Sequence, residues 1–139
     1  MPNIKALTVG EIRHIAFYLA KKLMEWDEPI PPFETRAKHI LESCLESPFQ
    51  TFGKRDLYRG LLRKGALLFY LLIKNHPFQN GNKRVAVTAL LVFLDKNKKW
   101  MRVSHQELYN FAVWVAESPS GLMEQIVDAI EVYLGKHSK

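Results

Sequence analysis

The sequence predicts an all-α domain of about six helices, and three observations lead to that class. Apolar residues recur every three or four positions along most of the chain, which is the spacing of a helix face turned toward a core. Ser or Thr followed three residues later by Glu, the pattern of a helix N-cap, stands at Thr8–Glu11 and Ser104–Glu107. Alternation of apolar and polar residues is almost absent, although we expect a short extended piece at residues 99–103.

The first two predicted helices flank a proline-rich segment. The Thr8–Glu11 capping pair opens a helix expected over about residues 9–25. Three prolines within residues 29–32 then exclude a helix and impose an extended linker. A second apolar stripe predicts a helix over residues 37–45, which ends before Pro48.

The next two predicted helices are the most apolar part of the chain. Asp56 is the expected N-cap of a helix that closes near Asn75, and its apolar face runs from Leu57 to Leu72. Residues 85–97 predict a strongly apolar fourth helix. Since both helices are apolar, we expect them to pack together in the core.

The last two predicted helices follow recognisable start and stop residues. Ser104 opens a helix through Ala116, and Pro119 and Gly121 break the chain before a last helix over about residues 122–134. Aromatic residues at helical spacing are assigned to the core: Phe69, Tyr70, Phe93, Tyr109, Phe111 and Trp114.

Length and composition limit the class of protein. The 139 residues suffice for one core but not comfortably for two, so residues 1–139 are predicted to form a single domain. Cys44 is the only cysteine, which excludes a disulfide framework and indicates a reducing compartment. No apolar run reaches the ~18 residues of a membrane span, and no secretory signal opens the chain. The expected location is therefore cytoplasmic, with no membrane partner.

The charge balance is basic, at +6 from 20 Lys and Arg against 14 Asp and Glu. Such a balance fits nucleic acid, nucleotide phosphate or an acidic protein, and does not choose among them. No nucleic-acid-binding motif is present, so nucleic acid is not the expected partner. Two groups of cations are assigned to solvated surface, with target or nucleotide contact as the alternative for the first: Lys54, Arg55 and Arg59, and the helix end with Lys96, Lys98, Lys99 and Arg102.

One loop concentrates chemistry between the two most apolar helices, with the sequence His76-Pro-Phe-Gln-Asn-Gly-Asn-Lys-Arg84. The start of a helix attracts anions through its free amides and its dipole. Gly81 lets the backbone approach a ligand closely, and Asn82, Lys83 and Arg84 add donors and two positive charges. This composition predicts a phosphate cradle, with a purely structural helix-to-helix turn as the alternative.

Three further residues of the loop have expected roles. His76 is the natural proton acceptor at neutral pH, because the unperturbed pKa of histidine lies near 6.5. Phe78 is expected to face the interior and anchor the loop. Asn80 is a weak candidate for a Mg²⁺ ligand through its carbonyl oxygen, or else a cap for the following helix.

The order of these residues resembles the core motif of the Fic/Doc superfamily, His-x-Phe-x-(Asp/Glu)-(Gly/Ala)-Asn-(Gly/Lys)-Arg. Every constrained position matches except Asn80, which replaces the acidic residue. The resemblance extends to QTFGKRDLY, LLIKNHPF and KRVAVTALLVFL, which look like the death-on-curing (Doc-like) branch, and it covers about residues 41–98. It implies a compact Fic/Doc-type helical domain with the motif loop between two central helices.

The resemblance also implies a function. Fic-type proteins hold ATP with Mg²⁺ over this loop and transfer part of it to a protein hydroxyl, with the motif histidine as general base, here His76. The anion hole for the phosphates carries over onto Asn82, Lys83 and Arg84. Doc-like toxins phosphorylate a target in the translation machinery, elongation factor Tu, and are neutralised by an antitoxin protein.

Departures from the motif leave more than one activity open. AMP-transferases of the superfamily generally have Gly at the position of Lys83 and a second Arg at that of Val87. Lys83 adds bulk and charge where those enzymes seat the β-phosphate, which favours a reversed nucleotide and phosphoryl transfer over AMP transfer. Asn80 is a poorer Mg²⁺ ligand than a carboxylate, so a slower kinase, an altered metal demand and a non-catalytic nucleotide- or antitoxin-binding relative all stay open.

Overall fold

The computed structural model describes residues 3–22 and 29–139. Its elements, in chain order, are α1 (Val9–His14), the π-helical turn η1 (Ile15–Leu19), the 3₁₀ turn η2 (Phe33–Thr35), α2 (Lys38–Glu46), the 3₁₀ turn η3 (Ser47–Phe49), strands β1 (Thr51–Phe52) and β2 (Arg55–Asp56), α3 (Leu61–Lys74), α4 (Asn82–Lys96), α5 (His105–Glu117), the 3₁₀ turn η4 (Ser120–Leu122) and α6 (Met123–His137). Six α-helices and one small hairpin confirm the all-α class.

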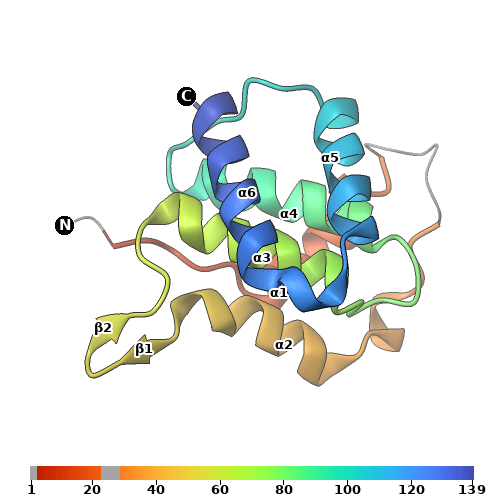
Figure 1. Ribbon diagram of the computed structural model, residues 1–139. Coiled ribbons are helices and arrows are strands. Elements are labelled where there is room, and N and C mark those ends of the chain that lie inside the picture. The colour runs from red at the N-terminus through yellow and green to blue at the C-terminus, as the bar shows by residue number, and fades with distance from the viewer. Residues whose placement is uncertain (1–2, 23–28) are drawn as a thin grey trace.

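Helix α3 is the centre of the fold and packs mainly against α4 and α6 (Figure 1). Every residue from Lys64 to Ile73 is buried, as expected for a helix that is apolar on nearly all sides. At Gly65 the neighbouring helices come within van der Waals contact, since a Cβ there would lie 3.4 Å from Leu90 of α4 and 3.7 Å from Leu134 of α6. This buried helix has a polar segment at each end, the hairpin before it and the loop from His76 to Arg84 after it.

The predicted helix starts are largely confirmed. The side chain of Thr8 accepts from the amide of Glu11 and the Glu11 carboxylate accepts from the amide of Thr8, which completes the capping box. Ser104 caps α5 by accepting from the amide of Glu107 at 3.1 Å. The first helix passes into the π-helical turn and reaches Leu19, and residues 23–25 of its predicted span lie outside the described residues.

The prediction that Asp56 caps the third helix is wrong. Gly60 is the N-cap of α3, and Asp56 belongs to a hairpin in which Thr51 pairs with Asp56. Gly53 and Lys54 form its turn with φ of 58° and 66°, the left-handed values of a tight two-residue hairpin turn. Asp56 instead accepts a hydrogen bond from the ammonium of Lys64 at 3.0 Å. Strands of two residues are too short to show the alternation that would have predicted them.

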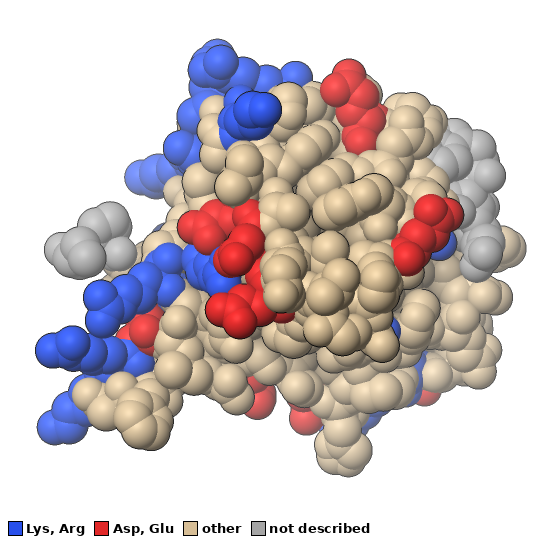
Figure 2. All heavy atoms as spheres, viewed as in Figure 1, with Lys and Arg blue, Asp and Glu red and all other residues tan. Residues whose placement is uncertain are grey.

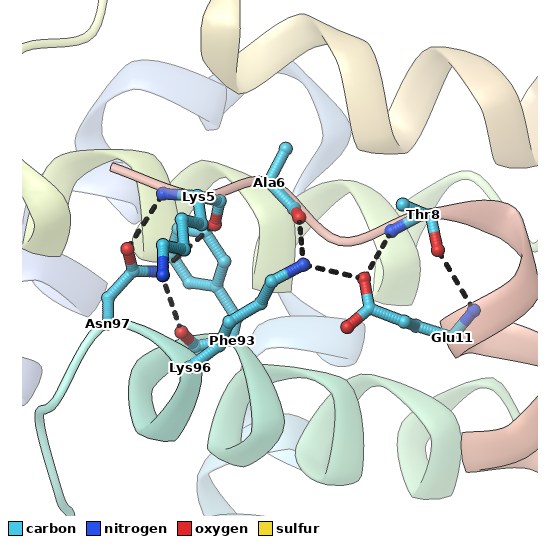
Figure 3. Close-up of polar contacts among 7 residues, drawn as sticks. All are labelled: Lys5, Ala6, Thr8, Glu11, Phe93, Lys96 and Asn97. Atoms are coloured by element: carbon cyan, nitrogen blue, oxygen red, sulfur yellow. Dashed lines mark hydrogen bonds and ion pairs between the residues drawn. The ribbon is translucent and has the colours of Figure 1, made fainter. Parts of the chain in front are cut away.

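The cationic end of α4 is not all solvated, which corrects a second expectation. The Lys96 ammonium donates to the carbonyl of Ala6 at 2.9 Å and to the carboxylate of Glu11 at 2.8 Å (Figure 3). Asn97 accepts from the amide of Lys5 and donates to its carbonyl (Figure 3). These bonds attach the N-terminal segment to the last turn of α4.

The aromatic residues assigned to the core divide into two groups. Phe69, Tyr70 and Phe93 are buried, whereas Trp114 is 47% exposed, and Tyr109 and Phe111 are half-buried on the outer helices. The expected extended piece at residues 99–103 is present, because Met101 forms an isolated bridge with Ser138.

Candidate active site

The loop from His76 to Arg84 joins the two central helices. Helix α3 ends at Lys74, and α4 begins at Asn82 with Gly81 as its N-cap. His76 and Gly81 both have left-handed backbones, with φ of 50° and 75°. The chain reverses between these two residues, so the loop has a face toward the core and a face toward solvent.

The core face of the loop is held by Phe78 and Asn82. Phe78 is 2% exposed and Asn82 is 7% exposed. The Asn82 side chain accepts from the amide of Phe78 at 3.0 Å and donates to its carbonyl at 2.7 Å. Because these bonds satisfy both backbone groups of a buried residue, they fix the shape of the loop.

The solvent face carries His76, Gln79 and Asn80, all exposed. The side-chain NH₂ of Asn82 lies 3.4 Å from the Nδ1 of His76 and donates to it in the tautomer whose Nδ1 carries no proton. The imidazole is therefore both open to a substrate and next to the first residue of α4. This is the position a general base for that helix end would need.

The first turn of α4 has the features of an anion site. Its N-cap is Gly81, which has no side chain to cap the free amides, and its first residues are Asn82, Lys83 and Arg84. The amides of these positions have no acceptor within the helix and point outward from its positive end. Lys83 is half-buried and adds a cation beside them.

Arg84 has a different surrounding from Lys83. It is 3% exposed, and its guanidinium donates to the carbonyl of Ala20 at 2.6 Å. This bond ties the first turn of α4 to the residue that follows the π-helical turn η1. The predicted phosphate donors are thus divided: Lys83 lies at the rim of the loop and Arg84 lies inside the protein.

Gly81 is in close contact with another part of the chain, at Ile30. It is buried, and a Cβ on it would lie 2.8 Å from the Cγ1 of Ile30 and 3.4 Å from the Cα of that residue. The close approach that the sequence predicted for a ligand is made here by another part of the chain. Any side chain at position 81 would force Ile30 to move.

Ile30 lies among the prolines that the sequence predicts to form an extended linker. The segment Ile30–Ala37, which we call the strap, packs along the core face of the motif loop. Beyond the Ile30 contact, the Phe33 ring centroid lies 6.2 Å from that of Phe78. The amide of Ala37 donates to the carbonyl of Pro77 at 2.8 Å. The strap is therefore the second support of the loop.

The strap is stiffened by a cation on an aromatic ring. The guanidinium carbon of Arg36 lies 3.9 Å from the centre of the Phe33 ring, and its Nη1 donates to the carbonyl of Phe33 at 3.2 Å. Phe33 is 4% exposed. In the sequence, the one signal that this segment packs against another part of the protein is an apolar phenylalanine between prolines and polar residues.

The donor set around the loop is poor in metal ligands. Asn80 offers a neutral amide oxygen, and the described residues contain no group of three or more His, Cys, Asp or Glu side chains that could hold a metal ion. Magnesium bound mainly by phosphate oxygens and water needs little more than this. The residues therefore fit Mg²⁺ arriving with a nucleotide better than a resident metal.

These observations define a helical domain in which an exposed histidine stands beside the positive start of a buried helix. A protein-family model described as the Fic/DOC family matches residues 6–94, more than half of the chain, and this chain belongs to that family. Members of the family are typically protein-modifying transferases. Comparisons with curated proteins and with solved structures gave no match. Among the described residues, no helix has the length and apolar character to cross a membrane.

Proposed function

We propose that this protein transfers the terminal phosphoryl group of ATP to a hydroxyl of a protein target, as Doc-like toxins do. The observation that carries the proposal is the position of His76, whose Nδ1 lies 3.4 Å from Asn82 at the positive start of α4. A base and an anion site side by side are what transfer from a nucleotide to a hydroxyl requires.

Each part of the loop then has a role in the transfer. The first-turn amides of α4 and the Lys83 ammonium bind the triphosphate of magnesium ATP. His76 takes the proton of the target hydroxyl as its oxygen bonds to the γ-phosphorus, and the bond to the bridging oxygen breaks to release ADP. Asn82 and Arg84 hold the loop in the shape that this geometry needs.

The choice of phosphoryl over AMP transfer is supported by two positions. Lys83 is the second residue of α4, where its side chain takes up the space of a β-phosphate seated in the AMP-transferase manner. Val87, where those enzymes generally have a second Arg, is fully buried. This chain therefore lacks the cation that would hold a nucleotide in that orientation.

A non-catalytic relative that binds a nucleotide or an antitoxin is the second candidate. It is favoured by Asn80, an amide in place of the motif's carboxylate, and by the absence of a metal-binding cluster among the described residues. A weaker metal site lowers the rate of transfer or removes it.

Isotope placement separates these candidates. The protein is incubated with magnesium and a cell extract, using ATP labelled at either the α or the γ position. Label from γ alone identifies a kinase, label from α an AMP-transferase, and no label from either a binding protein. His76→Ala should remove the transfer, and the matched control His105→Ala, an exposed histidine at the start of α5, should keep it.

The partners follow from the same proposal. We propose elongation factor Tu as the target, which would place the activity in the cytoplasm, and an antitoxin chain as the inhibitor. Purified elongation factor Tu with γ-labelled ATP tests the first directly. A small co-purifying protein would be identified as the antitoxin if its removal causes growth arrest. If its removal leaves growth unchanged, the proposal of an antitoxin is contradicted.

A further inference from the structure

A recess lies between the N-terminal segment and α2. It has a volume of about 440 Å³, within the range of pockets that hold small ligands or single side chains. Residues 6–9 form one wall, and Glu42, Leu45, Glu46 and Phe49 form the other. None of these residues belongs to the motif loop, so the recess is a separate feature of the molecule.

The floor of the recess is apolar. Leu7 and Leu45 are 5% and 6% exposed, and Val9 and Phe49 are partly buried apolar residues packed against the core. An aliphatic chain placed here would remove apolar surface from water, at about 25 cal/mol for each Å² buried.

The wall formed by residues 6–9 is fixed before any ligand arrives. The ammonium of Lys96 holds the carbonyl of Ala6, and the Thr8–Glu11 capping box holds the backbone at Thr8 (Figure 3). Lys96 also neutralises Glu11 at 2.8 Å. A preformed wall lowers the ordering cost of binding, and Glu11 already has its cation.

The two carboxylates that line the recess, those of Glu42 and Glu46, have no Lys or Arg partner among the described residues. Glu42 and Glu46 are one helical turn apart on α2, a spacing at which like charges repel. Within the described part of the chain, Glu42 pairs only with His39 at 4.0 Å, and Glu46 forms no ion pair. In a chain of net charge +6, this leaves a local negative site beside an apolar floor.

We infer that this recess binds a basic side chain, arginine above all, presented by a partner protein. The aliphatic stem lies on Leu45 and Phe49, and the guanidinium lies between Glu42 and Glu46. Arginine fits because its five donors in a rigid fork serve two carboxylates at once. Both carboxylates are on one wall, so the site recognises one cation, and the second ammonium of a free diamine would meet apolar surface.

The test is a nuclear magnetic resonance titration of the ¹⁵N-labelled protein with N-acetyl-arginine methylamide. The amides of Thr8, Val9 and Glu46 should shift together and saturate, with a dissociation constant of about 1–10 mM for a single side chain. The neutral isostere N-acetyl-citrulline methylamide should bind at least about threefold more weakly, because it loses the charge interaction. Shifts confined to other regions, or equal binding of the two compounds, would overturn the inference.

Single substitutions test whether Glu42 and Glu46 cause the preference for the arginine compound. Glu42→Gln and Glu46→Gln change exposed or half-exposed side chains, and each should reduce the preference for arginine over citrulline. Glu124→Gln, an exposed carboxylate in the first turn of α6, is the matched control and should keep it. Tighter binding of 1,5-diaminopentane than of the arginine compound would instead assign the recess to a small polyamine and reject a protein partner.

Discussion

The two ends of α3 carry polar segments of similar composition, and the fold treats them in opposite ways. The motif loop at its C-terminal end is supported from inside by Phe78, which is 2% exposed, while the hairpin at its N-terminal end presents Phe52, which is 79% exposed. Figure 2 shows Lys and Arg side chains gathered mostly at the left of the view, the side on which Figure 1 places the hairpin and the C-terminus. Lys and Arg residues occur at the hairpin as well, so they do not by themselves mark the candidate site; the buried aromatic ring of Phe78 distinguishes the motif loop from the hairpin.

The largest expected effect comes from removing the proposed general base, His76. If the motif loop is the catalytic region, His76→Ala should lower label transfer from γ-labelled ATP by about 10²- to 10⁴-fold, the usual contribution of a general base. Because the His76 side chain is exposed, its removal should change the free energy of unfolding by less than about 0.5 kcal/mol, as for other surface substitutions. An active His76→Ala variant would contradict the assignment, and an equally inactive hairpin variant Arg55→Ala would show that the two ends act together.

A matched pair of phenylalanines tests the difference in support. Phe78→Ala removes a buried ring that contacts the strap and should reduce the free energy of unfolding by about 3–5 kcal/mol. Phe52→Ala removes an exposed ring and should change it by less than about 0.5 kcal/mol. Urea denaturation of both variants measures the two values. Similar losses would mean that the hairpin aromatic is packed after all.

A matched pair of glycines tests the strap. Gly53 and Gly81 both have left-handed backbones, so Ala at either position costs about 1–2 kcal/mol of strain. A Cβ at Gly53 meets nothing within 4 Å, whereas one at Gly81 meets Ile30 at 2.8 Å. Gly81→Ala should therefore destabilise by about 1–3 kcal/mol more than Gly53→Ala in urea denaturation. Ile30→Ala removes the clashing Cγ1, so Gly81→Ala should cost less when it is made in an Ile30→Ala background than in the unmodified chain, and an undiminished cost would place the strain elsewhere.

The helices and the motif loop could be predicted because their signals are local. Thr8 with Glu11 shows a cap within four residues, and the apolar run of α3 shows a buried helix without reference to any other part of the chain. The hairpin gave no such signal, since a two-residue strand spans a single period of alternation and cannot show a repeat.

The supports of the candidate site could not be predicted, because they are contacts between distant parts of the chain. Nothing near Gly81 in the sequence shows that Ile30 packs on it, and nothing near Arg84 shows that its guanidinium turns inward to Ala20. A motif gives the type and order of the residues at a site. It does not give the burial of each side chain, which separates Lys83 from Arg84.

The hairpin end depends on one buried cation, and its removal should have the smallest effect of the variants that touch a support. Lys64 is 2% exposed, and its ammonium donates to Asp56 and to the carbonyl of Tyr58. Lys64→Met keeps the volume but leaves that carbonyl without its donor, which should cost about 1–2 kcal/mol. Asp56 is half-exposed, so water takes over the solvation of its carboxylate. Hydrogen exchange should rise in residues 51–58 and stay unchanged in residues 76–84; faster exchange at the motif loop would show that the two ends of α3 are coupled rather than independently supported.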